Sequence, residues 1–180
     1  MQLRAGRVDH VSGAVNALRR ILQAIRLSSS VVHDTLGITG AQLFVLQQIA
    51  EAPRASLREV AERTLTDQSS VSVVVSRLVD AGHVARRISA DDARRTELTL
   101  TESGRALVRR APELAQRRLV AGLRATPPAQ LRVTASVLDR LARALAPAGE
   151  PAPMFFEPPG KRRSARSRNH APRTGRGRSK

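Results

Sequence analysis

The segment 56–101 constrains the fold of this chain more tightly than any other stretch of its sequence. One helical apolar pattern covers Leu57 to about Thr64 and a second covers Asp67 to Ala81, with Leu65-Thr66 between them. Residues of alternating polarity follow directly after Gly82, which is a typical helix stop. The segment therefore predicts two helices joined by a tight turn and followed by a β hairpin.

The second of these helices has a core-facing side and an outward side that its own spacing fixes. The core-facing side carries Val71, Val74, Val75 and Leu78. The outward side and its flanks carry Ser69, Ser70, Ser72, Val73, Ser76 and Arg77. Small hydroxyl groups permit close approach to a DNA major groove, a valine methyl can contact thymine, and arginine can reach guanine or phosphate. The alternative is a serine-rich face that is only solvated.

The predicted hairpin ends in a cationic tip. Its outgoing strand is expected from Val84 to Ile88, and Leu98 and Leu100 alternate on the returning strand. The tip, residues 89–95, combines turn-forming residues with two arginines. Arginine at the end of a two-stranded ribbon suits a narrow minor groove, whose negative potential attracts it. The arginines predicted to contact DNA are Arg86, Arg94 and Arg95. The alternative is a solvated loop with a weak local Asp-Arg pair.

Four places predict the starts of helices. Thr39 with Gln42 and Ser56 with Glu59 fit the capping box, in which two side chains satisfy free amides reciprocally. Thr101-Glu102 combines an N-cap with an acid at the positive end of a helix. Thr126-Pro127-Pro128 places proline in a first helical turn. Between the last two starts, we expect a long helix from Glu102 to Arg124 with a kink at Pro112.

The two ends of the ordered region are predicted to form a dimer domain. The first helix carries a heptad seam of Val8, Val11, Val15, Leu18, Leu22 and Ile25. The last helix carries a stripe of Leu131, Val137, Leu138, Leu141 and Leu145. A seam of under three heptads also fits one face of an intramolecular core, and that alternative remains open.

The net charge of the chain indicates a polyanionic partner. The 180 residues contain 31 basic and 15 acidic side chains, a formal charge of +16. Residues 147–180 hold nine of the basic residues and two of the acidic ones, with recurring proline and glycine, so we expect a disordered Arg-rich tail. Within it, Met154-Phe155-Phe156 is unusually apolar, and we expect this tripeptide to dock on the domain; the alternative is an exposed apolar spot without a docking role.

Several functional classes find no support in the sequence. The chain has no cysteine, which excludes disulfides, thiolate metal sites and thiol-based sensing. Its four histidines have no metal-ligand spacing, and neither a phosphate-binding glycine loop nor a nucleophile motif is visible, so we expect no enzyme, no cofactor and no metal. Without an N-terminal apolar run or a membrane span, we expect a cytoplasmic, nucleoid-associated bacterial protein.

Residues 10–145 resemble the multiple antibiotic resistance regulator (MarR) family of bacterial transcription factors. The resemblance lies in the order and spacing of six motifs: Thr39-x-x-Gln42-x-x-Val45-Leu46, Leu57-x-Glu59-Val60-Ala61, Asp67-x-x-Ser70-Val71-Ser72, Gly82-x-Val84-x-Arg86, Asp92-x-Arg94 and Leu100-Thr101-x-x-Gly104. It implies a mainly α fold with a small β-hairpin wing, a winged helix-turn-helix. The implied domains are a dimerisation helix at 1–35, a DNA-binding lobe at 36–101, helices completing the dimer domain at 102–146, and the tail at 147–180.

The resemblance also implies roles for single residues. Gln68, Ser69, Ser70, Ser72 and Arg77 correspond to positions that meet DNA from the recognition helix. Arg94 corresponds to the minor-groove arginine, and Asp92 to a residue that supports the wing by pairing with arginine. In that family, anionic aromatic ligands bind a crevice between the dimer helices and the lobe, near which His33 and Phe44 are the candidates here.

The function expected from the sequence is therefore a dimeric, sequence-specific repressor that binds a near-palindromic operator in double-stranded DNA. Release by a small aromatic or anionic effector is expected from the family. The alternative is a non-specific architectural DNA-binding protein, because the Arg-rich tail alone attracts DNA. The shaped, small-residue face of the predicted recognition helix favours the repressor.

Overall fold

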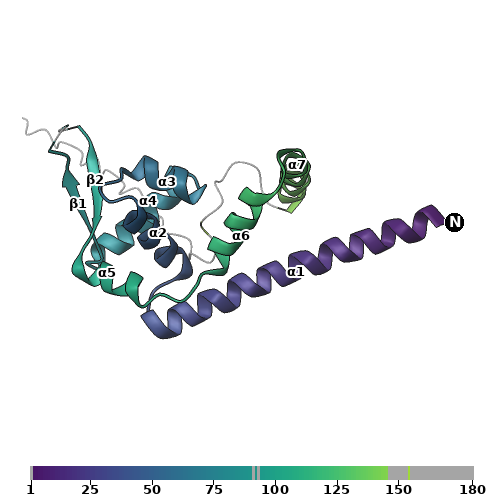
Figure 1. Cartoon of the computed structure of the whole chain (residues 1–180), viewed down its shortest axis with the longest axis horizontal. Helices are drawn as coiled ribbons and strands as arrows, with labels where there is room; N and C mark the ends of the chain where they lie inside the picture. Colours follow the sequence, from purple (N-terminus) through teal and green to yellow (C-terminus); the bar gives the residue numbers. More distant parts are fainter. Residues whose placement is uncertain (1, 91, 93, 146–153, 155–180) are drawn as a thin grey trace, which may run out of the picture.

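The computed structural model describes residues 2–90, 92, 94–145 and 154, and for residues 2–8 it describes the backbone alone. The elements in chain order are α1 (Gln2–Leu36), α2 (Gly40–Glu51), α3 (Leu57–Thr64), α4 (Gln68–Asp80), β1 (Val84–Ile88), β2 (Thr96–Leu100), α5 (Glu102–Arg109), α6 (Ala115–Ala125) and α7 (Pro128–Leu145). A lobe of α2 to α5 carries the hairpin on one side, and the long helix α1 extends away from it (Figure 1). The mainly helical fold with a two-stranded wing confirms the predicted fold class.

Helix α2 lies at the centre of the lobe. It packs against α1, α3, α4, α5 and β2, and its leucines and valine are buried almost completely. A helix surrounded on all sides has no solvent face, which explains the nearly continuous apolar sequence from Leu43 to Leu46. The valines predicted to face the core from α4 are fully buried as well: Val71, Val74 and Val75, together with Leu78.

The predicted helix starts are confirmed. Thr39 and Ser56 both form complete capping boxes with Gln42 and Glu59. Thr101 accepts a hydrogen bond from the backbone N–H of Gly104, and α7 begins at Pro128. These caps depend only on residues three positions apart, so the local sequence suffices to specify them.

The expected long helix from Glu102 to Arg124 is broken instead of kinked. Helix α5 ends at Arg109 and α6 begins at Ala115, with Pro112 in the non-helical connection. Proline removes one ladder hydrogen bond, and Leu114 turns into the core, where it is 2% exposed. The Oγ of Ser28 in α1 then accepts a hydrogen bond from the N–H of Ala115, so this tertiary contact takes up an amide at the start of α6.

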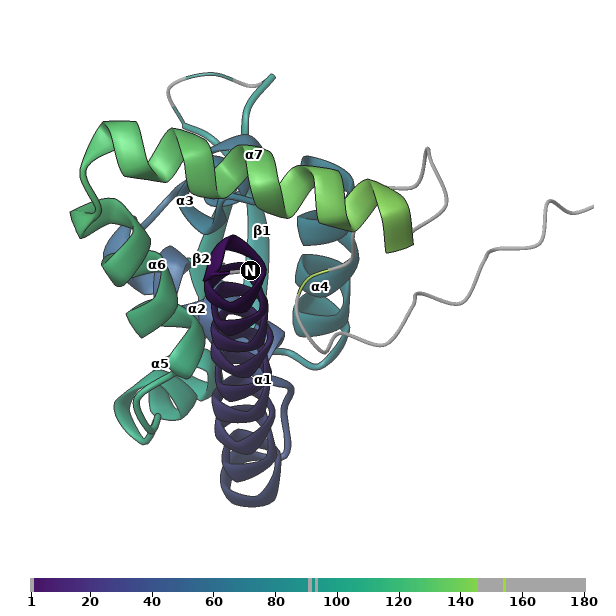
Figure 2. The same cartoon turned by 90° about the vertical axis from the view of Figure 1, so that its right-hand side faces the viewer.

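The predicted dimerisation residues lie mostly on exposed faces of this single chain. The exposed positions are Val11, Val15, Leu18 and Leu22 on α1 and Val137, Leu138, Leu141 and Leu145 on α7. Ile25 is buried against its own chain, and the side chain of Val8 lies outside the described residues. Helix α7 has no buried residue in the described part of the chain, and in the end-on view it runs across the direction of α1 (Figure 2).

Met154 is the one residue of the predicted tail that the structure describes. It is 4% exposed and belongs to the core of the lobe, so the predicted docking is confirmed for this residue. Phe155 and Phe156 lie outside the described residues, as does the rest of segment 147–180. Among the described helices, none combines the length and hydropathy that a bilayer-spanning segment requires.

Candidate DNA-binding surface

Helix α4 exposes a polar face on the side opposite its buried valines. Gln68, Ser69 and Val73 are exposed, and the remaining predicted positions are partly exposed: Ser70, Ser72, Ser76 and Arg77. Asp67 precedes the helix as its N-cap but makes no side-chain cap bond, unlike Thr39 and Ser56 at the starts of α2 and α3. The first turn of α4 therefore keeps backbone N–H groups that can donate to a phosphate.

The turn between α3 and α4 is unusually tight. Leu65 has φ of 54°, in the left-handed region, and its N–H bonds back to the carbonyls of Ala61 and Glu62. The N–H of Thr66 also donates a hydrogen bond to the carbonyl of Ala61, at 3.1 Å. The predicted helix-turn-helix is therefore present, with Leu65 at the position where helices commonly use glycine.

The hairpin of β1 and β2, residues 84–100, is called the wing below. Val84 pairs with Leu100 and Ile88 pairs with Thr96 in antiparallel register. Arg86 on β1 donates from Nη2 to the Oγ of Ser76 at 3.1 Å, which joins the wing to the recognition helix α4. Two predicted DNA-contacting residues are thus held together at the junction of helix and wing.

The wing tip is closed by the backbone and by Asp92. The Oδ1 of Asp92 accepts a hydrogen bond from the N–H of Arg94 at 2.9 Å, and its carbonyl accepts from the N–H of Arg95 at 2.9 Å. Asp92 thus supports the wing through the backbone, whereas the resemblance implied an arginine side chain as its partner. The side chain of Arg94 is exposed and has no ion-pair partner among the described residues.

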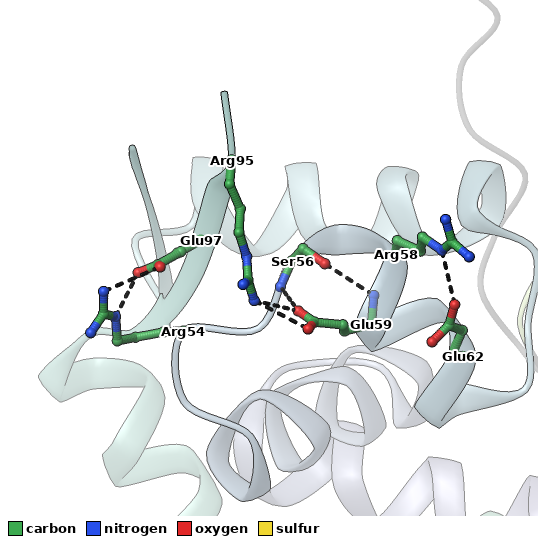
Figure 3. A network of polar contacts seen from close by, with 7 residues as sticks. All are labelled: Arg54, Ser56, Arg58, Glu59, Glu62, Arg95 and Glu97. Atoms are coloured by element: carbon green, nitrogen blue, oxygen red, sulfur yellow. Dashed lines mark hydrogen bonds and ion pairs between the residues drawn. The ribbon is translucent and has the colours of Figure 1, made fainter. Parts of the chain in front are cut away.

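Arg95 differs from its neighbour, because its guanidinium is engaged within the protein. Its Nη2 lies 2.9 Å and 3.1 Å from the two carboxylate oxygens of Glu59, the capping residue of α3. Nearby, the Nε of Arg54 donates to Glu97 at 2.7 Å, and Glu97 is 6% exposed (Figure 3). The sequence did not indicate these two pairs, because their members are 36 and 43 positions apart.

Both carboxylates of this network are held in the charged form. The pKa of Glu59 is lowered chiefly by the hydrogen bond from the backbone N–H of Ser56, with the Ser56 hydroxyl and Arg95 adding to the effect. The pKa of Glu97 is lowered chiefly by the hydrogen bond from Arg54, and further by one from Ser89. At neutral pH, both side chains therefore remain available as anionic partners of the arginines.

A cavity of about 620 Å³ lies between α2 and the connection from α5 to α6. Its lining includes Gln47, Val108, Leu114 and Arg117, and the Oε1 of Gln47 is buried without a hydrogen-bond partner in the described part of the chain. The two ligand candidates from the sequence do not line it. Phe44 is buried in the core, and His33 borders a smaller hollow of about 230 Å³ beside α1.

A helix-turn-helix whose second helix exposes a small polar face, followed directly by an arginine-tipped hairpin, defines a winged-helix DNA-binding protein. The sequence profile of the MarR family matches residues 36–95. Rv2887, an HTH-type transcriptional repressor of Mycobacterium tuberculosis, is 33% identical over 94 residues, covering 52% of this chain and 68% of that repressor. The repressor MdtR of Bacillus subtilis is 31% identical over 88 residues, 49% of this chain and 57% of MdtR. The chain therefore belongs to the MarR family and is a DNA-binding transcriptional regulator of the repressor type.

Solved structures agree with this fold. The structure of Bordetella bronchiseptica BpsR, whose DNA binding is regulated by 6-hydroxynicotinic acid, has a TM-score of 0.50 and 27% identity, covering 71% of this chain and 91% of BpsR. A MarR/EmrR family regulator from Acinetobacter sp. ADP1 also has a TM-score of 0.50, at 20% identity, covering 76% of this chain and 95% of that protein. The second likeness concerns the fold alone.

Proposed function

We propose that this protein is a dimeric repressor that recognises a near-palindromic operator. The observation that carries the proposal is the joint presentation of the outward face of α4 and the exposed Arg94 at the wing tip. A helix of this size fits the major groove, while an arginine on a ribbon reaches the minor groove beside it. A non-specific architectural protein has no need of a helix face shaped in this way.

Self-association is supported by the apolar residues that a single chain leaves exposed. Val11, Val15 and Leu18 on α1 and Leu138 and Leu141 on α7 are all at least 43% exposed. Covering such faces with a second copy removes apolar area from water, at about 25 cal/mol per Å². Helices α1 and α7 then form the dimer domain, and the twofold axis repeats the DNA-binding surface.

Selection of bound sequences from random double-stranded DNA tests this proposal. We expect enrichment of an inverted repeat whose half-site centres lie about 10 base pairs apart, because two α4 helices of a dimer enter successive major grooves. Sequencing of the captured DNA at several salt concentrations gives the result. Enrichment of no common sequence would contradict the repressor and support the architectural alternative.

We also propose that a small aromatic or anionic molecule bound in the 620 Å³ cavity releases the operator. The buried Oε1 of Gln47 needs a donor, because an unsatisfied buried acceptor costs about 1–3 kcal/mol. Two arginines and two carboxylates belong to the lining of the cavity: Arg117 pairs with Glu51 at 2.8 Å, and Arg118 and Glu113 complete the charged set. Val108 and Leu114 supply an apolar wall. Release follows if the ligand binds more tightly to a dimer whose recognition helices are spaced wrongly for the operator.

The compound that regulates BpsR provides a probe of this site. We expect 6-hydroxynicotinic acid to lower operator affinity in a titration followed by fluorescence anisotropy, because its ring carries a carboxylate and a polar ring substituent. The Gln47→Leu variant should respond less, since it lacks the acceptor. An equal response of wild type and variant would place the ligand elsewhere, and no response would exclude this acid as the effector.

A further inference from the structure

The returning strand of the wing is fastened to the rest of the lobe at three points, and Figure 3 shows the two that involve Glu97 and Arg95. At Leu98, the backbone N–H donates to the carbonyl of Ala55 at 2.9 Å. At Glu97, the carboxylate accepts from Arg54 at 2.7 Å and 3.3 Å. At Arg95, the guanidinium reaches both oxygens of Glu59. The contacts advance along the strand toward the tip, and the last one lies next to Arg94.

Glu59 is also held by bonds within its own helix start, independently of Arg95. Its Oε2 accepts a hydrogen bond from the N–H of Ser56 at 2.6 Å, while its own N–H donates to the Oγ of Ser56 at 3.2 Å. The capping box therefore holds the carboxylate at the start of α3. A side chain held by its own capping box is a well-placed anchor for the strand that binds it.

Arg95 is fixed at its backbone as well as at its guanidinium. Its N–H donates to the carbonyl of Asp92, and its own carbonyl accepts from the N–H of Ser89 at 2.8 Å. These bonds close the tip, but they lie within the hairpin and do not fix its angle to the helices. A two-stranded hairpin is marginal on its own, so contacts with the lobe decide where its tip lies.

The small energy of the Glu59–Arg95 contact indicates that it positions the wing and adds little to stability. Arg95 and Glu59 are 45% and 46% exposed, and an ion pair as exposed as this adds at most about 1 kcal/mol to stability. Its effect on DNA binding can be larger, because a wing that is already held in the bound position loses less freedom on binding.

We propose that the Glu59–Arg95 pair, the wing clamp, sets the angle of the wing against α3 and thereby aims Arg94 at the minor groove. This inference rests on the proposed operator binding. Glu59 is then a positioning residue for DNA recognition, although a negative charge by itself repels DNA. In this proposal Arg95 holds the wing against α3, and Arg94 contacts the DNA.

The rival assignment gives Arg95 a direct contact with DNA. In that case Glu59 competes with the phosphates for the guanidinium, and removing its charge strengthens binding. The wing clamp gives the opposite sign, because removing the charge of Glu59 frees the wing and weakens binding. The effect of one substitution at Glu59 therefore separates the two assignments.

The experiment compares Glu59→Gln with Glu62→Gln on the same helix. Glu62 also pairs with an arginine, Arg58, at 2.9 Å, but this pair lies along α3 and does not contact the wing (Figure 3). Both substitutions remove one negative charge from α3, so their long-range effect on DNA attraction is closely matched. Glutamine at 59 retains the capping-box acceptor, and thermal unfolding of both variants checks that α3 is intact.

We expect Glu59→Gln to bind the selected operator about fivefold more weakly than Glu62→Gln, within the range measured for coupled neighbouring residues. Hydroxyl-radical protection should fall in the minor groove flanking each half-site. Arg95→Gln should weaken binding to the same extent, and the double variant Glu59→Gln/Arg95→Gln should lose little more. Since Arg95→Gln leaves the capping box untouched, it tests the clamp independently of α3.

Operator binding by Glu59→Gln that equals or exceeds that of Glu62→Gln overturns the wing clamp. If Arg95→Gln alone is weakened, Arg95 contacts DNA directly and the clamp is again overturned. The wild-type protein serves as the reference for the proposed function, because a failure of wild type to prefer any sequence refutes both proposals. A wild type that binds specifically beside an unaffected Glu59→Gln refutes the clamp alone.

Discussion

Replacing Arg94 with alanine is expected to lower operator affinity at least about tenfold, which corresponds to about 1.4 kcal/mol. The side chain is exposed at the wing tip without an ion-pair partner among the described residues, so the protein does not use its charge internally. In the bound state, the guanidinium would enter a narrow minor groove, where the negative potential is strongest. Quantitative footprinting on the selected operator measures the loss.

The control for this prediction is Arg110→Ala. Arg110 is also exposed, but it follows α5 at the other end of the lobe from the wing tip (Figure 1). Its removal lowers the net charge by the same amount and should change affinity far less. Both variants should unfold at the wild-type temperature, because neither residue is buried. An Arg94→Ala protein that binds like Arg110→Ala would refute the minor-groove role.

The second large effect is expected for stability, in the variant Gly104→Ala. A Cβ at residue 104 would lie 2.1 Å from the carbonyl oxygen of His83 and 3.1 Å from its carbonyl carbon. That carbonyl also accepts a hydrogen bond from the N–H of Thr101, so it belongs to the base of the wing and cannot move freely. We expect a loss of about 3 kcal/mol in the free energy of unfolding, at the upper end of the usual range for overpacking.

Gly122→Ala provides the matched control, with the opposite sign. Gly122 lies within α6, and a Cβ there would have no atom within 4 Å. Alanine should therefore stabilise the protein by about 0.5–1 kcal/mol through its higher helix propensity. Denaturant unfolding of both variants at one protein concentration makes the comparison, since self-association changes apparent stability. A Gly104→Ala protein as stable as wild type would show that α5 can move away from the wing base.

The local rules that worked on the sequence depend on residues a few positions apart. Capping boxes at Thr39 and Ser56 and the buried valines of α4 follow from spacings of three or four residues, and the stop at Gly82 follows from a single residue. The same rules placed Ser69 and Val73 on the outward face, and the structure leaves both exposed. The class of protein followed from these short-range patterns and their order along the chain.

Short-range sequence patterns predicted less well where a tertiary contact decided which of two local conformations the chain adopts. The sequence placed a kink at Pro112, but the chain breaks there because Leu114 is drawn into the core and Ala115 bonds to Ser28. From the sequence, Arg95 was assigned to DNA together with Arg94, and that assignment stays a prediction. The structure pairs Arg95 with Glu59, and no local pattern distinguishes two adjacent arginines at a turn.

For the wing, the sequence and the tertiary structure determined different features. Alternating residues and turn formers in the sequence determined that a hairpin with an arginine tip follows the recognition helix. Only the tertiary structure decided how that hairpin is held, through Glu59 with Arg95 and Glu97 with Arg54. The physical reason is distance along the chain: hydrogen bonds within a helix or a turn join near neighbours, whereas these pairs form only after the strand has folded back onto α3.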